Sequence, residues 1–180
     1  MKMPGTVTTP MLTLERWRLD DVPHIVEAAN VSLAELGYWL PWAAHGPLTT
    51  ESVTSTIMDA IAAFDVGTDH HYAIRNSTGT LLGCIAVHIH HPATAEIGYW
   101  IRSDWTGRGV ATAAVRSLTG VVFESLPSIK TVQIRMDRAN AASAAVARSA
   151  GYTLKQSETR PIVTIGHTGV GQVWTSNRER

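Results

Sequence analysis

The sequence predicts an α+β fold in a single domain spanning residues 1–180. Three observations carry this prediction. The length of 180 residues is close to that of one ordinary domain. Segments with apolar residues at every second position are typical of strands, and segments with a three-to-four-residue period are typical of helices. Antiparallel strands come first along the chain, and a strand–helix–strand–helix portion follows, in which the strands must pair in parallel or splay apart.

The first 67 residues predict one strand and three helices. Residues 11–18 alternate between apolar and polar, as a half-buried strand does. Asp20 and Asp21 supply a cap for a helix that ends near Asn30. The aromatic-rich segment 33–42 predicts a short helix running into a loop, and a longer helix begins at Thr50 or Ser52 and ends at Gly67.

From residue 70 onward the period changes to two. Segments 71–75 and 81–90 predict a hairpin around the turn 76–79, and 95–101 predicts a further strand. A glycine-containing loop then leads into a helix. The remaining elements are expected to be a helix over 110–124, a strand over 129–136, a helix over 140–151, and strands over 152–156 and 170–176.

Composition excludes several classes of protein. Fifteen Lys and Arg balance fifteen Asp and Glu, so the chain lacks the basic field that binds nucleic acid or acidic membranes. No stretch reaches the roughly 18 apolar residues that a membrane span needs. Cys84 is the single cysteine and cannot form an internal disulfide, and the N-terminus lacks the apolar run of a signal peptide. A cytoplasmic protein is expected.

The loop Thr106–Ala111, with Gly107 and Gly109, lies between a predicted strand and a predicted helix. Its backbone N–H groups and the positive end of the helix converge there, which predicts an anion site. No Lys-Ser/Thr follows the glycines, so the loop is not a Walker loop. The full Gly-x-Gly-x-x-Gly pattern is also absent, which disfavours a dinucleotide fold. A tight turn before a helix remains the simpler alternative.

Three motifs occur in a fixed order: Ala95–Ile101, Trp105–Thr112, and Asn140-x-x-Ser143 running to Gly151-Tyr152. Together they resemble the successive motifs of GNAT acetyltransferases, and most closely the RimJ/RimL-type protein N-terminal acetyltransferases. Segment 32–43 is similar to that branch too. The superfamily's pyrophosphate motif begins with Gln or Arg, whereas Thr106 stands at that position here.

The resemblance implies a mostly antiparallel central sheet of about seven strands with a splayed parallel pair, flanked by about four helices. It implies acetyl-CoA as cosubstrate, no metal, and direct acetyl transfer to a primary amine, foremost the α-amino group of a protein or peptide. Two alternatives stay open: an enzyme that detoxifies a small amine or antibiotic, and a catalytically decayed acyl-CoA-binding sensor. A homodimer is also left open.

The resemblance also implies which residues meet acetyl-CoA. They lie in the strand predicted over 95–101, in the glycine loop and at the start of the last helix: Tyr99, Trp100, Ile101, Thr106, Gly107, Arg108, Gly109, Val110, Ala111, Thr112, Asn140 and Ser143. Arg102, Arg108 or Arg148 could meet a remaining phosphate, and each could equally be a solvated arginine.

Many GNAT enzymes carry a tyrosine seven residues after the asparagine, where Ala147 stands here. The resembled branch instead uses a serine three residues after it, so the resemblance implies that Ser143 is the partner of the leaving thiolate. Asn140 is expected to anchor pantetheine. The alternative is that Asn140 only caps its helix and Ser143 only packs. Glu96 is the candidate base, acting directly or through water, and the alternative is a structural carboxylate.

The acceptor side is expected to use Trp39, Trp42, His88 and Glu96, although at least one of the tryptophans is expected to bury against the sheet. A histidine there could also assist deprotonation. His88 and His90 share a strand face, but no third ligand stands at a recognisable spacing, so a metal site is not predicted. Cys84 is expected in the core rather than as a nucleophile.

Overall fold

The computed structural model describes residues 2–178, apart from the side chain of residue 90. One eight-stranded sheet runs through it, in the order β1-β2-β3-β4-β5-β6-β8-β7. The strands are β1 Thr6–Thr8, β2 Thr13–Arg16, β3 Asp69–Arg75, β4 Leu81–His91, β5 Thr94–Ile101, β6 Thr131–Asp137, β7 Thr153–Thr159 and β8 Val170–Asn177. The α-helices are α1 Val22–Val31, α2 Leu33–Trp39, α3 Thr50–Val66, α4 Val110–Ser125 and α5 Ala141–Ser149.

The predicted fold class is confirmed, and each predicted strand and helix is present. The structure adds β1, a three-residue strand at the edge of the sheet that pairs with β2. Its sequence, Thr-Val-Thr, is too short to show a period. At the long helix α3, the predicted start and end are close to those observed: Thr49 accepts from the backbone N–H of Ser52, and Gly67 ends the helix with a left-handed φ of 84°.

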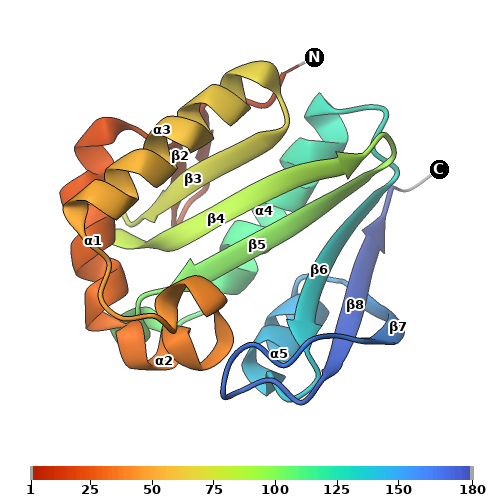
Figure 1. Cartoon of the computed structure of the whole chain (residues 1–180). Coiled ribbons are helices and arrows are strands. Elements are labelled where there is room, and N and C mark those ends of the chain that lie inside the picture. Colours follow the sequence, from red (N-terminus) through yellow and green to blue (C-terminus); the bar gives the residue numbers. More distant parts are fainter. Residues whose placement is uncertain (1, 179–180) are drawn as a thin grey trace.

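The splayed parallel pair is also confirmed. Strand β5 pairs with β6 in parallel from Thr94 opposite Thr131 to Glu96 opposite Gln133, whereas its other neighbour β4 pairs with it in antiparallel fashion as far as Ile101. Figure 1 shows β5 and β6 adjacent at one end and separated at the other. The backbone of β5 beyond Glu96 therefore presents one edge that β6 does not cover.

Helices cover both faces of the sheet. On one face α4 and α5 bury a large core that includes Leu14, Ile85, Ile97 and Leu118. On the other face α1 and α3 cover a smaller core, to which Cys84 contributes. Burial raises the pKa of the Cys84 thiol, so this residue is an inert part of the core, as expected. Within residues 2–178, no helix is both long and apolar enough to cross a membrane.

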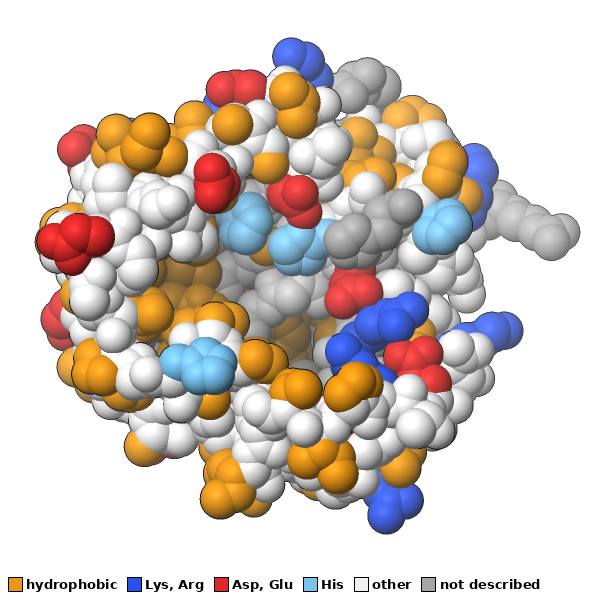
Figure 2. Space-filling view, viewed as in Figure 1, with side chains coloured by type: hydrophobic (Ala, Val, Ile, Leu, Met, Phe, Trp, Pro, Cys, Tyr) orange, Lys and Arg blue, Asp and Glu red, His pale blue; other side chains and the backbone are white. Residues whose placement is uncertain are grey.

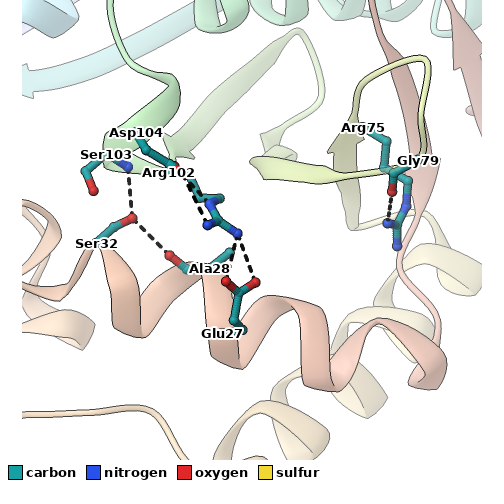
Figure 3. Close-up of polar contacts among 8 residues, drawn as sticks. All are labelled: Glu27, Ala28, Ser32, Arg75, Gly79, Arg102, Ser103 and Asp104. Atoms are coloured by element: carbon teal, nitrogen blue, oxygen red, sulfur yellow. Dashed lines mark hydrogen bonds and ion pairs between the residues drawn. The ribbon is translucent and has the colours of Figure 1, made fainter.

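Polar contacts fix the end of α1 to the segment that precedes the glycine loop (Figure 3). The buried Ser32 hydroxyl donates to the carbonyl of Ala28 and accepts from the backbone N–H of Ser103, both at 2.9 Å. Arg102 forms ion pairs with Glu27 and Asp104, each at 2.9 Å. Through these two carboxylates, the Arg102 guanidinium links α1 to the segment that precedes the glycine loop.

Gly83 lets β4 and β5 approach one another. A Cβ at this residue would lie 2.2 Å from the carbonyl oxygen of Trp100, and its φ of 153° is one that side-chain-bearing residues rarely adopt. We therefore expect Gly83→Ala to lower the free energy of unfolding by about 2 kcal/mol or more, measured by urea denaturation.

Gly120→Ala is the matched control, because a Cβ at this helical position meets nothing within 4 Å. Alanine is a better helix former, so this variant should gain roughly 0.5–1 kcal/mol. A Gly83→Ala variant as stable as the wild type would show that the strands can separate locally without cost.

Candidate active site

A cavity of about 910 Å³ lies where β5 and β6 diverge. The N-terminal ends of α4 and α5 meet at it, and α2 and the loop between β7 and β8 also line it. All the residues expected to meet acetyl-CoA line this cavity, with the exception of Arg108. The guanidinium of Arg108 instead lies 4.7 Å from the centre of the Trp105 ring. The sequence motifs thus converge on one site, although they lie on three different elements.

The glycine loop has the backbone geometry of an anion site. Gly107 and Gly109 have φ values of 71° and 77°, in the left-handed region that favours glycine, and Gly109 is the N-cap of α4. The first N–H groups of a helix have no partner within the helix and lie at its positive end. The Thr106 hydroxyl donates to the carbonyl of Ser103 at 2.9 Å, so this side chain supports the loop.

Tyr99 and Ser143 meet in the same cavity. Their hydroxyl oxygens are 2.9 Å apart, which joins β5 to the first turn of α5. Asn140 accepts from the backbone N–H of Ser143 at 2.9 Å and so caps this helix, while also lining the cavity. Burial raises the pKa of Tyr99, which keeps its hydroxyl protonated at neutral pH. The hydroxyl groups of Tyr99 and Ser143 are therefore hydrogen-bonded to one another, a contact that the sequence analysis did not predict.

Glu96 lies between two side chains of β6. Its Oε2 accepts from Gln133 at 3.0 Å and forms an ion pair with Arg135 at 3.2 Å. Arg135 also pairs with Glu158 on β7 at 2.9 Å. Glu96 is not among the described residues that line this cavity. The carboxylate therefore takes part in a network that links β5, β6 and β7.

A second cavity, of about 580 Å³, lies on the side of the sheet covered by α1 and α3. It shares Leu40, Gly98, Tyr99 and Trp100 with the first cavity, so the two meet along β5. Figure 2 shows a hollow in this face of the molecule, with histidine and acidic side chains along one rim. The remaining walls are mostly apolar or aromatic, and they include Trp17, Trp42 and Val53.

The expectation that Trp39 or Trp42 buries against the sheet is wrong. Trp39 is half-buried and lines the first cavity, whereas Trp42 is 40% exposed and lines the second. The Trp42 ring lies 6.1 Å from that of Trp100, which lines the same cavity. Helix α2 ends at Trp39, and Pro41 begins a separate 3-10 turn that contains Trp42.

Three polar side chains lie close together beside the second cavity, and the two histidines among them line it. Asp69 and His71 on β3 and His88 on β4 have ligand atoms that all lie within 4.8 Å of one another. The Asp69 carboxylate pairs with Nδ1 of His88, and the His71 and His88 rings lie 5.4 Å apart. The side chain of His90, the other histidine that the sequence analysis placed on this face, lies outside the described part of the chain.

Burial of His71 makes stability depend on pH. Desolvation, and then the neighbouring His88, lower the pKa of His71 from 6.5 to about 4. The unfolded chain therefore takes up this proton first as the pH falls, and the native state loses stability between about pH 6.5 and 4. The loss from His71 alone should be on the order of 3 kcal/mol.

We expect His71→Gln to flatten the fall in the free energy of unfolding between pH 7 and 4.5, as measured by urea titration. The slope will not vanish, because burial also lowers the pKa of His70. His91→Gln, at an exposed position, is the control and should leave the slope unchanged. An identical slope in His71→Gln and wild type would show that His71 is not held neutral.

The loop between β7 and β8 is attached to the rest of the site at three points. Gly166 donates its N–H to the carbonyl of Tyr38 at 2.9 Å, and Nε2 of His167 lies 3.0 Å from the carbonyl oxygen of Trp39. Thr168 donates to the carboxylate of Asp137 through both its N–H and its hydroxyl. The loop thus links α2 to the end of β6.

The pattern described as "Acetyltransferase (GNAT) domain" matches residues 11–153. The Bacillus subtilis (strain 168) protein YdaF, named as a ribosomal N-acetyltransferase, is 29% identical over 143 residues, which cover 78% of this chain and 77% of YdaF.

Three solved structures show the same fold. RimL, a ribosomal L7/L12 alpha-N-protein acetyltransferase in complex with coenzyme A, has a TM-score of 0.86 at 20% identity and covers 97% of each chain. MccE, a microcin C7 self immunity acetyltransferase in complex with acetyl-CoA and AMP, has a TM-score of 0.88 at 20% identity, with 97% of each chain covered. Mycobacterium smegmatis RimJ in complex with CoA-disulfide has a TM-score of 0.81 at 21% identity, with 92% of this chain and 81% of that chain covered.

Proposed function

Because the chain belongs to the GNAT acetyltransferase family, we propose that it transfers the acetyl group of acetyl-CoA directly to the α-amino group of a protein or peptide. The first cavity is assigned to acetyl-CoA. The N–H groups at the start of α4 would bind its pyrophosphate, and the open edge of β5 would pair with pantetheine. Gly107 and Gly109 give that backbone the required conformation.

In this proposal Ser143 donates a proton to the thiolate that leaves the acetyl group. Its hydroxyl lies 2.9 Å from that of Tyr99, so Tyr99 is the residue that orients Ser143 and can return a proton to it. Asn140 holds the first turn of α5 in place through its cap. Backbone N–H groups near Tyr99–Ile101 are the proposed donors to the oxyanion of the tetrahedral intermediate.

The observation that carries the choice of acceptor is the lining of the second cavity. Among its described lining residues there is no Asp or Glu, and most are apolar or aromatic. The nearby Asp69 carboxylate is paired with His88. A cationic acceptor such as a polyamine or aminoglycoside is usually met by acidic groups. A peptide N-terminus carries one amine, and about a tenth of it is already neutral at pH 7 because its pKa is near 7.7–8.0. This amine, attached to uncharged residues, fits these walls.

A small amine or antibiotic remains the second candidate. RimL, an alpha-N-protein acetyltransferase, and MccE, a microcin C7 self immunity acetyltransferase, match this fold about equally well, with TM-scores of 0.86 and 0.88. The fold alone therefore does not choose between the two candidates. A catalytically decayed acyl-CoA sensor is disfavoured, because Tyr99, Ser143 and the glycine loop meet in one cavity.

The test is release of free thiol from acetyl-CoA in the presence of three kinds of acceptor: peptides with different uncharged N-terminal residues, polyamines, and amine antibiotics. Each peptide is paired with its N-acetylated form, which has no α-amine. We expect turnover with free peptides and none with their blocked forms. Turnover with small amines alone would support the second candidate, and binding of acetyl-CoA without turnover of any acceptor would support the sensor.

A further inference from the structure

We propose that the second cavity receives the side chain of the acceptor's first residue and selects a large apolar one, such as leucine, methionine or phenylalanine. This inference rests on the proposed function and deepens it by naming the class of acceptor. Three features of the second cavity carry it: the place where it meets the acetyl-CoA cavity, the small residues on the sheet side, and the apolar walls around them.

The two cavities meet along β5, where Gly98, Tyr99 and Trp100 belong to the lining of both. In the proposed function the acetyl group lies at this stretch of β5, because backbone N–H groups near Tyr99–Ile101 bind the oxyanion. An α-amine that attacks there lies beside the shared wall. The side chain of the first residue begins on the carbon next to that nitrogen, so it is the acceptor side chain closest to the second cavity.

Small residues leave room on the sheet side of this cavity. Ala86 of β4 lies directly opposite Gly98 of β5, and both line the cavity. Residues directly opposite one another on paired strands share a face of the sheet. The neighbouring pairs on that face contain larger side chains, Trp100 opposite Cys84 and His88 opposite Glu96. The alanine–glycine pair therefore forms a depression between larger residues, next to the wall that the two cavities share.

The surrounding walls are mainly aromatic and aliphatic. Trp17, Trp42 and Trp100 line the cavity, as do Ile25 of α1 and Val53 of α3. No Lys, Arg, Asp or Glu is among the described residues that line it. The lining is completed by a few polar side chains, Ser52, Thr56, His71 and His88.

These walls favour an apolar side chain over a charged one. Burial lowers the pKa of His71 to about 4, so this imidazole is neutral at pH 7. A leucine or phenylalanine side chain would remove its apolar surface from water against the indole rings. A lysine or glutamate side chain would lose hydration without an opposite charge in the lining to compensate it.

The size of the cavity favours a large side chain over a small one. Its volume is about 580 Å³, and Figure 2 shows the hollow open to solvent on one side. A cavity of about 150 Å³ is enough to hold benzene. Leucine, methionine and phenylalanine therefore fit, whereas alanine or serine would leave most of the apolar wall in contact with water. Each additional methylene that a hydrophobic pocket buries favours the larger substrate by roughly tenfold or more.

The first test is kcat/KM for peptides that differ only in their first residue, which is leucine, methionine, phenylalanine, alanine, serine or glutamate. The three large apolar residues should give values at least roughly tenfold above the other three. Exchanging alanine for leucine at the second residue instead should change kcat/KM by less than about threefold. Values for alanine or serine equal to those for leucine, or a larger effect at the second residue, would overturn the proposal.

The second test fills the depression. Ala86→Leu places a larger side chain opposite Gly98, and it should lower the ratio of kcat/KM for the leucine peptide to that for the alanine peptide by at least about tenfold. Ala62→Leu is the matched control, because it makes the same change at an exposed position of α3 that lines neither cavity. The control should keep the wild-type ratio. A wild-type ratio in Ala86→Leu would contradict the assignment of this cavity.

Trp42→Ala gives a second route if Ala86→Leu does not fold, because Trp42 is 40% exposed. Loss of this aromatic wall should lower the ratio of kcat/KM for the phenylalanine peptide to that for the alanine peptide by roughly fivefold, and an unchanged ratio would count against the proposal. The unfolding midpoint of each variant separates loss of folding from a change of specificity.

Failure of this inference differs visibly from failure of the proposed function. In the first case the wild type acetylates peptides, but with no preference for a large apolar first residue. In the second case the wild type acetylates none of the peptides in the series.

Discussion

Gly109→Asp is expected to abolish measurable binding of acetyl-CoA, with a loss of affinity of at least roughly a hundredfold, or about 2.8 kcal/mol. Gly109 is the N-cap of α4 and lines the first cavity. An aspartate there places a carboxylate beside the N–H groups assigned to the pyrophosphate, so two anions compete for one positive helix end. Calorimetric titration with acetyl-CoA measures the effect.

The left-handed backbone of Gly109 adds strain to any substitution, at a cost of about 1–2 kcal/mol. Gly67→Asp controls for that strain. Gly67 has a φ of 84°, a Cβ there also meets nothing within 4 Å, and it lies at the far end of α3 rather than in the cavity. Gly67→Asp should bind acetyl-CoA normally. Unchanged affinity in Gly109→Asp would contradict the assignment of the glycine loop.

Ser143→Ala is expected to lower kcat by about a hundredfold while changing the affinity for acetyl-CoA less than about threefold. The hydroxyl of Ser143 is the group proposed to protonate the leaving thiolate, and alanine keeps the helix and its Asn140 cap, which uses only the backbone N–H of this residue. Steady-state thiol release gives kcat, and calorimetry gives the affinity.

Ser125→Ala makes the same change at the last residue of α4, which is not part of the lining of either cavity. This variant should retain the wild-type kcat. If Ser143→Ala turned over as fast as wild type, Ser143 would be a packing residue and the Tyr99 hydroxyl beside it would have no catalytic partner.

Much of the fold was accessible from the sequence because local signals agreed with one another. Period-two and period-3.6 patterns located the strands and helices. At α3, Thr49 caps the start of the helix, and Gly67 ends it with a left-handed backbone conformation. The splay between β5 and β6 was not accessible from periodicity. It followed from the resemblance to GNAT acetyltransferases, and the register of β5 with β6 confirms it.

The cofactor side of the site could be predicted because its residues lie in contiguous motifs. The acceptor side could not, because its key contacts depend on strand register. Arg75 pairs with Leu81, but an irregularity at Ile74 and Arg75 shifts the rest of the β3–β4 hairpin by one residue. Without that shift Asp69 would lie opposite Val87, and His88 would point to the other face of the sheet. The bulge is what brings Asp69 and His88 together.

Glu96 illustrates the same limit. Strand alternation correctly places it on one face with Gly98 and Trp100, but alternation does not show that Gln133 and Arg135 of the neighbouring β6 contact its carboxylate. These contacts arise from the three-residue parallel pairing between β5 and β6. The role of Glu96 as a base remains a prediction.

The most direct measurement of the central claim is the site of acetylation in the product. A peptide with an uncharged N-terminal residue and one internal lysine is incubated with the protein and acetyl-CoA, and the product is fragmented in a mass spectrometer. We expect one acetyl group, located on the α-nitrogen and absent when Gly109→Asp replaces the wild type. Acetyl on the lysine side chain, or no acetylated peptide while small amines are acetylated, would contradict it.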